Sequence, residues 1–173
     1  MRKLVYGGAI SLDGYLARDD GSVDWIIHSD DAMKIMQEMW PRFDAMIMGR
    51  KTYEFAKGGS AALYGDMRVV VFSRTLESGM EGGMEIVNSD AAEFVAAMKG
   101  EHGEDIMLMG GGDLARSLFV ASLIDEIGFN IHPLLLGSGI PAFHRMADQI
   151  GLELIQSRPL SSGCVYATYN VKT

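Results

Sequence analysis

The segment that most constrains this chain is an apolar strand that runs through a glycine into a helix, at residues 44–54 (Asp-Ala-Met-Ile-Met-Gly-Arg-Lys-Thr-Tyr-Glu). The predicted strand ends at Gly49, and the helix that follows carries Arg50, Lys51 and Thr52 in its first turn. Free backbone N–H groups at a helix N-terminus favour an anion. Two cations and a hydroxyl strengthen the case for a phosphate, although taken alone such a turn is equally compatible with an ordinary solvated surface.

A second junction of the same kind lies at residues 106–113 (Ile-Met-Leu-Met-Gly-Gly-Gly-Asp). Gly110, Gly111 and Gly112 are consecutive, which carries a large entropic cost that a simple turn rarely requires. Glycines there let a ligand approach the backbone, and Asp113 is a candidate cap for the following helix. Two such junctions in one small domain predict one long ligand with phosphates at separate points, most simply a dinucleotide.

Composition narrows the classes of partner. The chain has 173 residues, the length of one domain spanning 1–173, and a formal net charge of −8. Because phosphate contacts need a basic face, this charge argues against a nucleic-acid partner. No apolar run approaches the roughly 20 residues needed to span a bilayer, so no membrane partner is expected. The single cysteine, Cys164, permits no internal disulfide and no zinc cluster. We therefore expect a cytoplasmic protein without a metal site.

Strand-like and helix-like segments alternate along the chain, which predicts a mainly parallel sheet covered by helices on both faces. The last two strands have no helix between them, so they should form an antiparallel hairpin at a sheet edge. Residues 11–28 form a long loop, typical of a lid or binding loop. Ligands of such sheets lie beyond the carboxyl ends of the strands, where both glycine junctions are expected. The predicted strands are 4–10, 45–48, 68–73, 85–87, 106–109, 124–132, 152–156 and 165–171, and the predicted helices are 30–40, 51–56, 90–99 and 113–121.

Neither GxGxxG nor GxxxxGK[ST] is present, so the sequence supports neither a Rossmann fingerprint nor a P-loop. Arg74, after the strand at 68–73, is either an exposed surface arginine or, with Arg50 or Lys51, a ligand for an adenosine 2′-phosphate. The second alternative would make the cofactor NADPH rather than NADH.

Five segments in this order resemble the dihydrofolate reductase-like superfamily over nearly the whole chain. The resemblance is closest to standalone bacterial proteins similar to the C-terminal reductase domain of the riboflavin-biosynthesis deaminase–reductase. The segments are 11–17 (SLDGYLA), 47–54 (IMGRKTYE), 71–74 (VFSR), 109–112 (MGGG) and 123–137.

The resemblance implies a three-layer α/β/α fold with a mixed, mainly parallel sheet and an antiparallel C-terminal hairpin. It also implies NADPH bound across the carboxyl edge of the sheet, with the loop from Ser11 to Trp25 closing over the nicotinamide. The cofactor-binding residues carried over from the family are Gly49, Arg50, Lys51, Thr52, Ser73, Arg74, Gly110, Gly111, Gly112, Asp113 and Leu114.

The substrate residues match two branches of the superfamily incompletely. Dihydrofolate reductases place an acid five residues after a loop tryptophan, and Trp25 and Asp30 keep that spacing, so Asp30 is a candidate proton-relay carboxylate. Asn130 falls near the partner of that acid. On local grounds alone Asp30 is a helix-start residue, Asp13 a turn residue and Trp25 either a packing residue of the lid or a stacking ring.

Pyrimidine reductases of the riboflavin pathway usually carry an Asp-Asp-Pro run where this chain has Glu54-Phe55-Ala56, and often a glutamate where it has Met109. The resemblance therefore predicts an NADPH-dependent reductase of a small heterocycle, similar to 5-amino-6-(5-phosphoribosylamino)uracil reductase. The alternatives are a dihydrofolate reductase acting on a pterin and a non-catalytic nucleotide-binding module. Asp13, Trp25 and Asn130 are the expected substrate or lid residues, and a homodimer is expected because relatives commonly dimerise.

Overall fold

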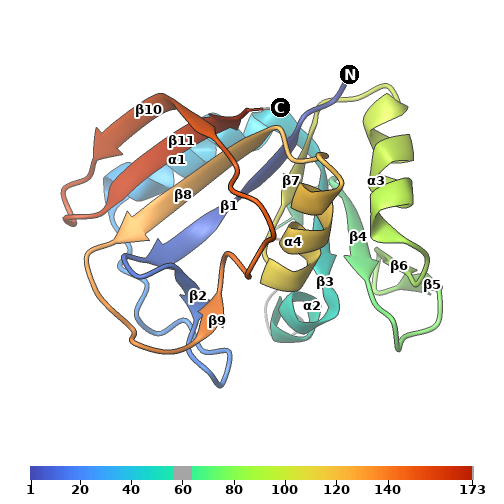
Figure 1. The fold of residues 1–173 in the computed structure, drawn as a ribbon, viewed down its shortest axis with the longest axis horizontal. Helices are drawn as coiled ribbons and strands as arrows, with labels where there is room; N and C mark the ends of the chain where they lie inside the picture. The colour runs from blue at the N-terminus through green and yellow to red at the C-terminus, as the bar shows by residue number, and fades with distance from the viewer. Residues whose placement is uncertain (57–63, 173) are drawn as a thin grey trace.

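A computed structural model describes residues 1–56 and 64–172. Strands alternate with helices as predicted, and both termini lie at the end of the molecule opposite α2 (Figure 1). The strands are β1 (Leu4–Ser11), β2 (Tyr15–Ala17), β3 (Phe43–Gly49), β4 (Arg68–Phe72), β5 (Gly79–Glu81), β6 (Met84–Val87), β7 (Asp105–Leu108), β8 (Glu126–His132), β9 (Ile140–Pro141), β10 (Leu152–Pro159) and β11 (Val165–Val171). The helices are α1 (Asp30–Met39), η1 (Trp40–Arg42), α2 (Arg50–Ala56), α3 (Ala91–Gly100) and α4 (Gly112–Val120).

The main sheet has nine strands in the order β10-β11-β8-β1-β7-β3-β4-β6-β5. Its centre is parallel, from β8 through β1, β7, β3 and β4 to β6. The last two strands form an antiparallel hairpin, and β10 is an edge strand. The fold is therefore the predicted mixed, mainly parallel sheet with an antiparallel C-terminal hairpin.

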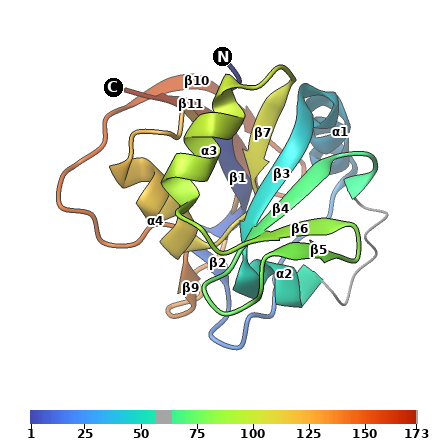
Figure 2. The same cartoon turned by 90° about the vertical axis from the view of Figure 1, so that its right-hand side faces the viewer.

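Side chains that alternate along the buried strands build a core on each face of the sheet. On β1, Leu4 and Tyr6 belong to the core that includes side chains of α3 and α4, whereas Val5 belongs to the core that includes Tyr53 of α2. On β3, Ile47 likewise joins the first core. The views in Figures 1 and 2 place α3 and α4 on one face and α1 on the other. These two cores make the three-layer α/β/α arrangement that the sequence predicts.

Two short pairings escaped the sequence analysis. Within the segment 11–28, predicted to be a loop, β2 pairs in antiparallel fashion with β9, which lies more than a hundred residues later. Strand β5 is exposed at every position and pairs only with its neighbour β6. Neither segment has the long alternating pattern that identifies a strand from sequence, because these strands have two or three residues each. Boundaries also moved, most at β10, which continues to Pro159.

Ion pairs link residues at the amino ends of the parallel strands. Arg42 lies 2.7 Å from Asp105 and 2.7 Å from Glu126, which also accepts from Lys3 at 2.6 Å. Burial alone would raise the pKa of Glu126, but its hydrogen bonds to Arg42 and Lys3 hold that pKa below its usual range. The buried Lys99 is held in the same region by a 2.6 Å contact with a carboxylate.

No helix within the described part of the chain is long and apolar enough to cross a lipid bilayer.

Candidate cofactor cleft and lid

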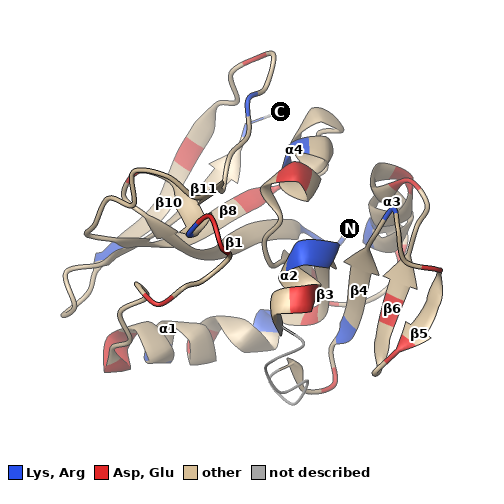
Figure 3. Cartoon of the chain, turned by 90° about the horizontal axis from the view of Figure 1, so that it is seen from below, with Lys and Arg blue, Asp and Glu red and all other residues tan. Residues whose placement is uncertain are grey.

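A cleft of about 1180 Å³ crosses the carboxyl ends of β1, β7, β3 and β4. Figure 3 views the molecule from this side, with α2 near the centre. The cleft combines residues from three separate junctions of the sheet, as the sequence predicted for one long ligand. Every predicted cofactor-binding residue lines it: Gly49, Arg50, Lys51, Thr52, Ser73, Arg74, Gly110, Gly111, Gly112, Asp113 and Leu114.

The two glycine junctions lie against each other. Gly110 and Gly111 have φ values of 81° and 92°, a region that favours glycine. A Cβ atom on Gly111 would lie 3.5 Å from the backbone nitrogen of Gly49, and one on Gly110 would lie 3.5 Å from the Thr52 hydroxyl oxygen. The triple glycine therefore brings the backbones after β7 and β3 together at the floor of the cleft.

Helix α4 begins at Gly112, with Gly111 as its N-cap, and in the described part of the chain no side chain caps its first amides. The prediction that Asp113 caps this helix is wrong, because Asp113 lies one residue inside the first turn and its side chain is 78% exposed. Uncapped N–H groups at a helix start are available to an anion in the cleft.

The predicted cations of the cleft differ in their partners. Arg50 donates to Glu54, one turn along α2, at 2.7 Å. Lys51 and Arg74 are exposed, and within the described part of the chain neither has a hydrogen-bond or ion-pair partner. Ser73 stabilises the turn that contains Arg74, since its hydroxyl accepts from the backbone N–H groups of Thr75 and Leu76. The structure thus leaves Lys51 and Arg74 available to an external phosphate.

Sequence reasoning missed two basic residues of the cleft, Arg116 and His144. His144 packs against the start of α4: a Cβ atom on Gly112 would come within 2.7 Å of the imidazole ring, and Nε2 lies 3.7 Å from an oxygen of Asp113. Arg116 stands about one turn after Gly112, which the sequence could have suggested. His144 reaches the cleft because it lies on the loop after β9, and no local sequence pattern predicts that position.

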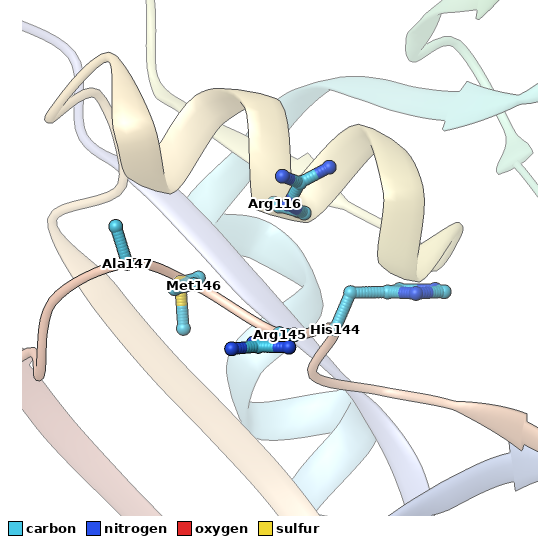
Figure 4. Close-up of a pocket in the computed structure, with 5 residues that line it drawn as sticks. All are labelled: Arg116, His144, Arg145, Met146 and Ala147. Carbon is cyan, nitrogen blue, oxygen red and sulfur yellow. The ribbon is translucent and has the colours of Figure 1, made fainter.

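Arg116 and His144 also line a second hollow of about 490 Å³ between α4 and the loop that follows β9. Figure 4 shows Arg116 on the helix and His144 and Arg145 on the facing loop, with Met146 and Ala147 beyond them. This hollow adds positive charge to the α4 side of the cleft.

Asp13 ties the predicted lid to the loop that follows β8 and lies outside the cleft lining. Its carboxylate accepts from the backbone N–H groups of Leu136 at 3.1 Å and Gly137 at 2.8 Å, and from the Ser11 hydroxyl at 2.6 Å. The Ser11 hydrogen bond and then the two amides lower the pKa of Asp13. Asp13 is thus a clasp that holds these two loops together. This role is closer to the turn residue expected on local grounds than to a residue that contacts a ligand.

Trp25 and Asn130 lie behind the cleft lining rather than in it. Trp25 is 7% exposed and meets the His132 ring edge-on at 5.1 Å between centroids. Nδ1 of His132 accepts from the backbone N–H of Ile27 at 3.3 Å, and Asn130 lies 3.4 Å from the other ring nitrogen. The indole nitrogen of Trp25 and the amide oxygen of Asn130 are buried without a hydrogen-bond partner in the described structure.

Asp30 is exposed at the start of α1 and does not line the cleft. Its neighbour Asp31 has the structural role, since it accepts from the Ser161 amide at 2.6 Å and so joins α1 to the turn of the C-terminal hairpin. The Ser161 amide and then the Ser29 hydroxyl lower the pKa of Asp31 to about 2. The structure brings Trp25 and Asn130 together around His132 and leaves Asp30 apart from the cleft.

Among the residues that the structure describes, no group of three or more His, Cys, Asp or Glu side chains is placed to hold a metal ion.

Comparisons with known proteins bear on this arrangement. The chain is 34% identical over 155 residues to the uncharacterized protein YwjB of Bacillus subtilis, covering 88% of this chain and 89% of that one. A solved structure from Shewanella sp. PV-4, assigned to riboflavin biosynthesis, superposes with a TM-score of 0.85 at 25% identity and full coverage of both chains.

Two more distant structures share the fold. The deaminase/5-amino-6-(5-phosphoribosylamino)uracil reductase of Thermotoga maritima gives a TM-score of 0.73 at 16% identity, covering 99% of this chain and 57% of that one. Dihydrofolate reductase of Enterococcus faecalis, complexed with NADP(H), gives 0.73 at 16% identity, with 99% and 97% coverage. These likenesses show a dihydrofolate reductase-like fold.

The family model for the RibD C-terminal domain matches residues 2–166. Since that match covers almost the whole chain, this protein belongs to the RibD C-terminal domain family.

Proposed function

We propose that this protein is an NADPH-dependent reductase of a small heterocyclic substrate, similar to the pyrimidine reductases of its family. The observation that carries the proposal is the single cleft in which all the predicted cofactor residues meet, although they come from three distant parts of the sequence. Family membership and the reductases among the structural neighbours support the same reaction class.

The residues of the cleft fit a dinucleotide. Gly110 and Gly111 leave space where side chains would stand, and the uncapped start of α4 offers N–H groups to a pyrophosphate. Lys51 and Arg74, which have no partner among the described residues, supply positive charge in a chain of net charge −8. When bound, NADPH supplies a hydride from its nicotinamide ring.

The chain's own contribution is positioning and exclusion of water. The lid from Ser11 to Trp25 would cover the reactive end of the cofactor, fastened at Asp13. Holding two reactants in register is worth about 7–11 kcal/mol of the barrier when they are well aligned.

The preference for NADPH would rest on Arg74 and Lys51. A guanidinium or ammonium that faces a 2′-phosphate makes charge-assisted hydrogen bonds, which contribute about 1.5–3 kcal/mol each. Arg74→Ala should therefore weaken NADPH binding by roughly tenfold to a hundredfold and leave NADH binding nearly unchanged. Arg50, already engaged by Glu54, should show a smaller effect.

Titration with NADPH and with NADH, read by nicotinamide fluorescence, tests the proposal. The expected result is saturable NADPH binding and its selective loss in Arg74→Ala. Failure of NADPH to bind at millimolar concentration would remove the proposed function, and equal losses for both nucleotides in Arg74→Ala would remove the 2′-phosphate role. Arg68→Ala is a matched control, because Arg68 lies at the opposite end of β4 and pairs with Glu85 and Glu101 outside the cleft lining.

A non-catalytic nucleotide-binding module is the second candidate. It is favoured by the position of Asp30, which is exposed and outside the cleft lining, so the carboxylate expected for a pterin reductase is not presented to the ligand. NADPH binding without NADPH oxidation in the presence of pterins, pyrimidines and uncharged carbonyl compounds would favour this candidate.

We also propose that the protein is a homodimer formed through β10. This strand is an open edge, and Leu154 and Ile155 on it are 54% and 47% exposed. An exposed apolar edge strand is a ready template for pairing with a second chain. Light scattering with size-exclusion chromatography should give twice the 18.9 kDa chain mass, and Ile155→Lys should reduce it to one chain.

A further inference from the structure

Three basic side chains surround the hollow of about 490 Å³ that adjoins the cleft (Figure 4). Arg116 comes from α4, and His144 and Arg145 come from the loop that follows β9. The other two residues of its lining in the described part of the chain are Met146 and Ala147, which carry no charge. The hollow therefore gathers positive charge in a chain whose formal net charge is −8.

The two arginines of this hollow are exposed and have no partner within the described part of the chain. Neither Arg116 nor Arg145 makes a hydrogen bond or an ion pair there, whereas a structural arginine such as Arg42 contacts two carboxylates, Asp105 and Glu126. An anion in the hollow would therefore gain two guanidinium groups without breaking an existing ion pair.

Two carboxylates lie near these cations along the chain, and neither is an ion-pair partner of the arginines. Asp113, in the first turn of α4, has an oxygen 3.7 Å from Nε2 of His144, and its side chain is 78% exposed. Asp148 follows Arg145 by three residues, is exposed and does not line the hollow. Because Arg116 and Arg145 are not neutralised within the described chain, the potential in the hollow favours an anion.

The loop that carries His144 and Arg145 is anchored directly before these residues. Ala142 is fully buried, and its carbonyl oxygen accepts from the Tyr6 hydroxyl at 2.8 Å. The ring of Phe143 then meets the Tyr6 ring edge-on, with 5.8 Å between centroids. Since this backbone is fixed before a ligand arrives, the ordering cost of binding is reduced.

His144 and Arg116 join the hollow to the cleft. Both residues line the two spaces, whereas Arg145 lines the hollow and not the cleft. The His144 ring lies against the start of α4, where a Cβ atom on Gly112 would come within 2.7 Å of it. The hollow is thus continuous with the α4 side of the cleft, and Arg145 is the basic residue that distinguishes the two.

We propose that Arg116, His144 and Arg145 form an anion site for a phosphate or diphosphate group, apart from the cleft cations Lys51 and Arg74. Guanidinium groups match phosphate oxygens in both geometry and charge, and an imidazole supplies one N–H even when it is neutral. The group belongs either to a second ligand that binds alongside the coenzyme or to the coenzyme itself. The site does not depend on the proposed reductase reaction.

Titration of the full chain with inorganic pyrophosphate, measured by calorimetry, tests the inference. The expected result is saturable binding at or below millimolar concentration that weakens as salt is added, because ions screen an exposed site. Arg145→Ala should weaken this binding by about three- to tenfold, the scale of one charged contact at a partly screened surface. Absence of pyrophosphate binding at millimolar concentration, or equal affinity in the parent and Arg145→Ala, overturns the inference.

A matched control separates a site from general attraction to positive charge. Arg158→Ala removes the same charge from an arginine of similar exposure class, which pairs with Glu38 and lines neither the hollow nor the cleft. Its affinity for pyrophosphate should stay within about twofold of the parent, because salt screens a charge that does not contact the anion. An equal loss in Arg158→Ala and Arg145→Ala would overturn the inference.

A second titration, with NADPH present, identifies the source of the phosphate group. Pyrophosphate binding that persists beside NADPH, and that Arg145→Ala still weakens, assigns the site to a second ligand. Displacement of pyrophosphate by NADPH, with weaker NADPH binding in Arg145→Ala, assigns it to the coenzyme. Absence of NADPH binding would overturn the proposed function alone, since the effect of Arg145→Ala on pyrophosphate still decides whether the anion site exists.

Discussion

Charged side chains are paired at the amino ends of the parallel strands, whereas at the carboxyl ends two cations are left without a partner in the described structure. At the amino ends, Arg42 contacts two carboxylates, Asp105 and Glu126, and Arg2 pairs with Asp44 in the same layer. At the carboxyl ends, Lys51 and Arg74 have no partner within the described residues, and the first amides of α4 have no side-chain cap.

This difference has a physical reading. Charges that are satisfied within the chain stabilise the fold, whereas cations and N–H groups left unsatisfied at one edge are available to a ligand. Parallel strands place the junctions after β7, β3 and β4 on the same edge, so three segments that are distant in the sequence can offer these groups to one ligand. Mutations at the two edges should accordingly separate stability from the affinity for the proposed cofactor.

The largest expected effect is at the floor of the cleft. A Cβ atom on Gly112 would overlap the Pro141 carbonyl oxygen and the His144 ring, whereas one on Gly49 would meet nothing within 4 Å. Gly112→Ala should therefore lower the free energy of unfolding by about 1–3 kcal/mol, as overpacking does, and weaken NADPH. Gly49→Ala should weaken NADPH while leaving stability within about 0.5 kcal/mol of the parent. Urea unfolding and fluorescence titration measure the two quantities, and equal destabilisation by both variants would contradict the geometry.

The next largest effect is expected when an ion pair at the amino ends of the strands is removed. Arg42→Ala leaves Glu126, whose side chain is 6% exposed, with Lys3 as its remaining cationic partner. Because the Arg42 side chain is itself 39% exposed, solvent screens part of the loss, and we expect a decrease of about 1–2 kcal/mol in the free energy of unfolding. NADPH affinity should not change. Lys51→Ala at the opposite edge should weaken NADPH binding and leave the free energy of unfolding unchanged. If either variant changed both NADPH affinity and the free energy of unfolding, the proposed difference between the two edges would be wrong.

The sequence predicted the carboxyl edge better than it predicted the lid. Gly49-Arg50-Lys51-Thr52 and the triple glycine are local signals: strand, turn and helix follow one another, and each residue's role depends on its immediate neighbours. Parallel strand order then brings such junctions together, so the fold, and the meeting of the predicted cofactor residues in one cleft, followed from local pattern and the family resemblance.

The lid and substrate end depend on contacts that no local pattern carries. Strand β2 exists because β9 lies beside it, and His144 reaches the cleft through the loop after β9. The spacing from Trp25 to Asp30 suggested a catalytic carboxylate, yet Asp31 has the hydrogen-bonded position and Asp30 is exposed. One residue of offset at a helix start changes which side chain reaches the turn of the C-terminal hairpin, and sequence spacing does not resolve that.

Lowering the pH should destabilise the protein through the buried imidazole of His132. Burial, followed by the charge of His28, holds the pKa of His132 below its ordinary value of 6.5. The unfolded chain therefore binds a proton that the folded chain resists, so stability is complete above pH 6.5 and falls as the pH drops below it. The expected loss is up to about 1.4 kcal/mol per pH unit. His132→Phe should flatten this part of the stability profile measured by urea unfolding between pH 7.5 and 5, and an unchanged slope would assign the titration to another group.

The smallest predicted effect concerns the lid clasp. Asp13→Ala removes the acceptor of the Leu136 and Gly137 amides, so the proposed lid should open more often, without a change at the proposed phosphate-binding residues. Because both hydrogen bonds are exposed to solvent, we expect their combined loss to accelerate amide hydrogen exchange over residues 11–25 by about two- to tenfold, as the loss of one typical hydrogen bond would. Exchange in β3 and β7 should not change. The hydrogen bonds from Ser11 and these amides lower the pKa of Asp13, so the clasp is fully formed above the ordinary carboxyl value of 3.8 and is lost as the pH falls through the lowered value. Asp20→Ala is the matched control, because Asp20 lies in the same loop and accepts from Ser22 within that loop rather than from a second loop. Equal acceleration in both variants would mean that the loop moves independently of the clasp.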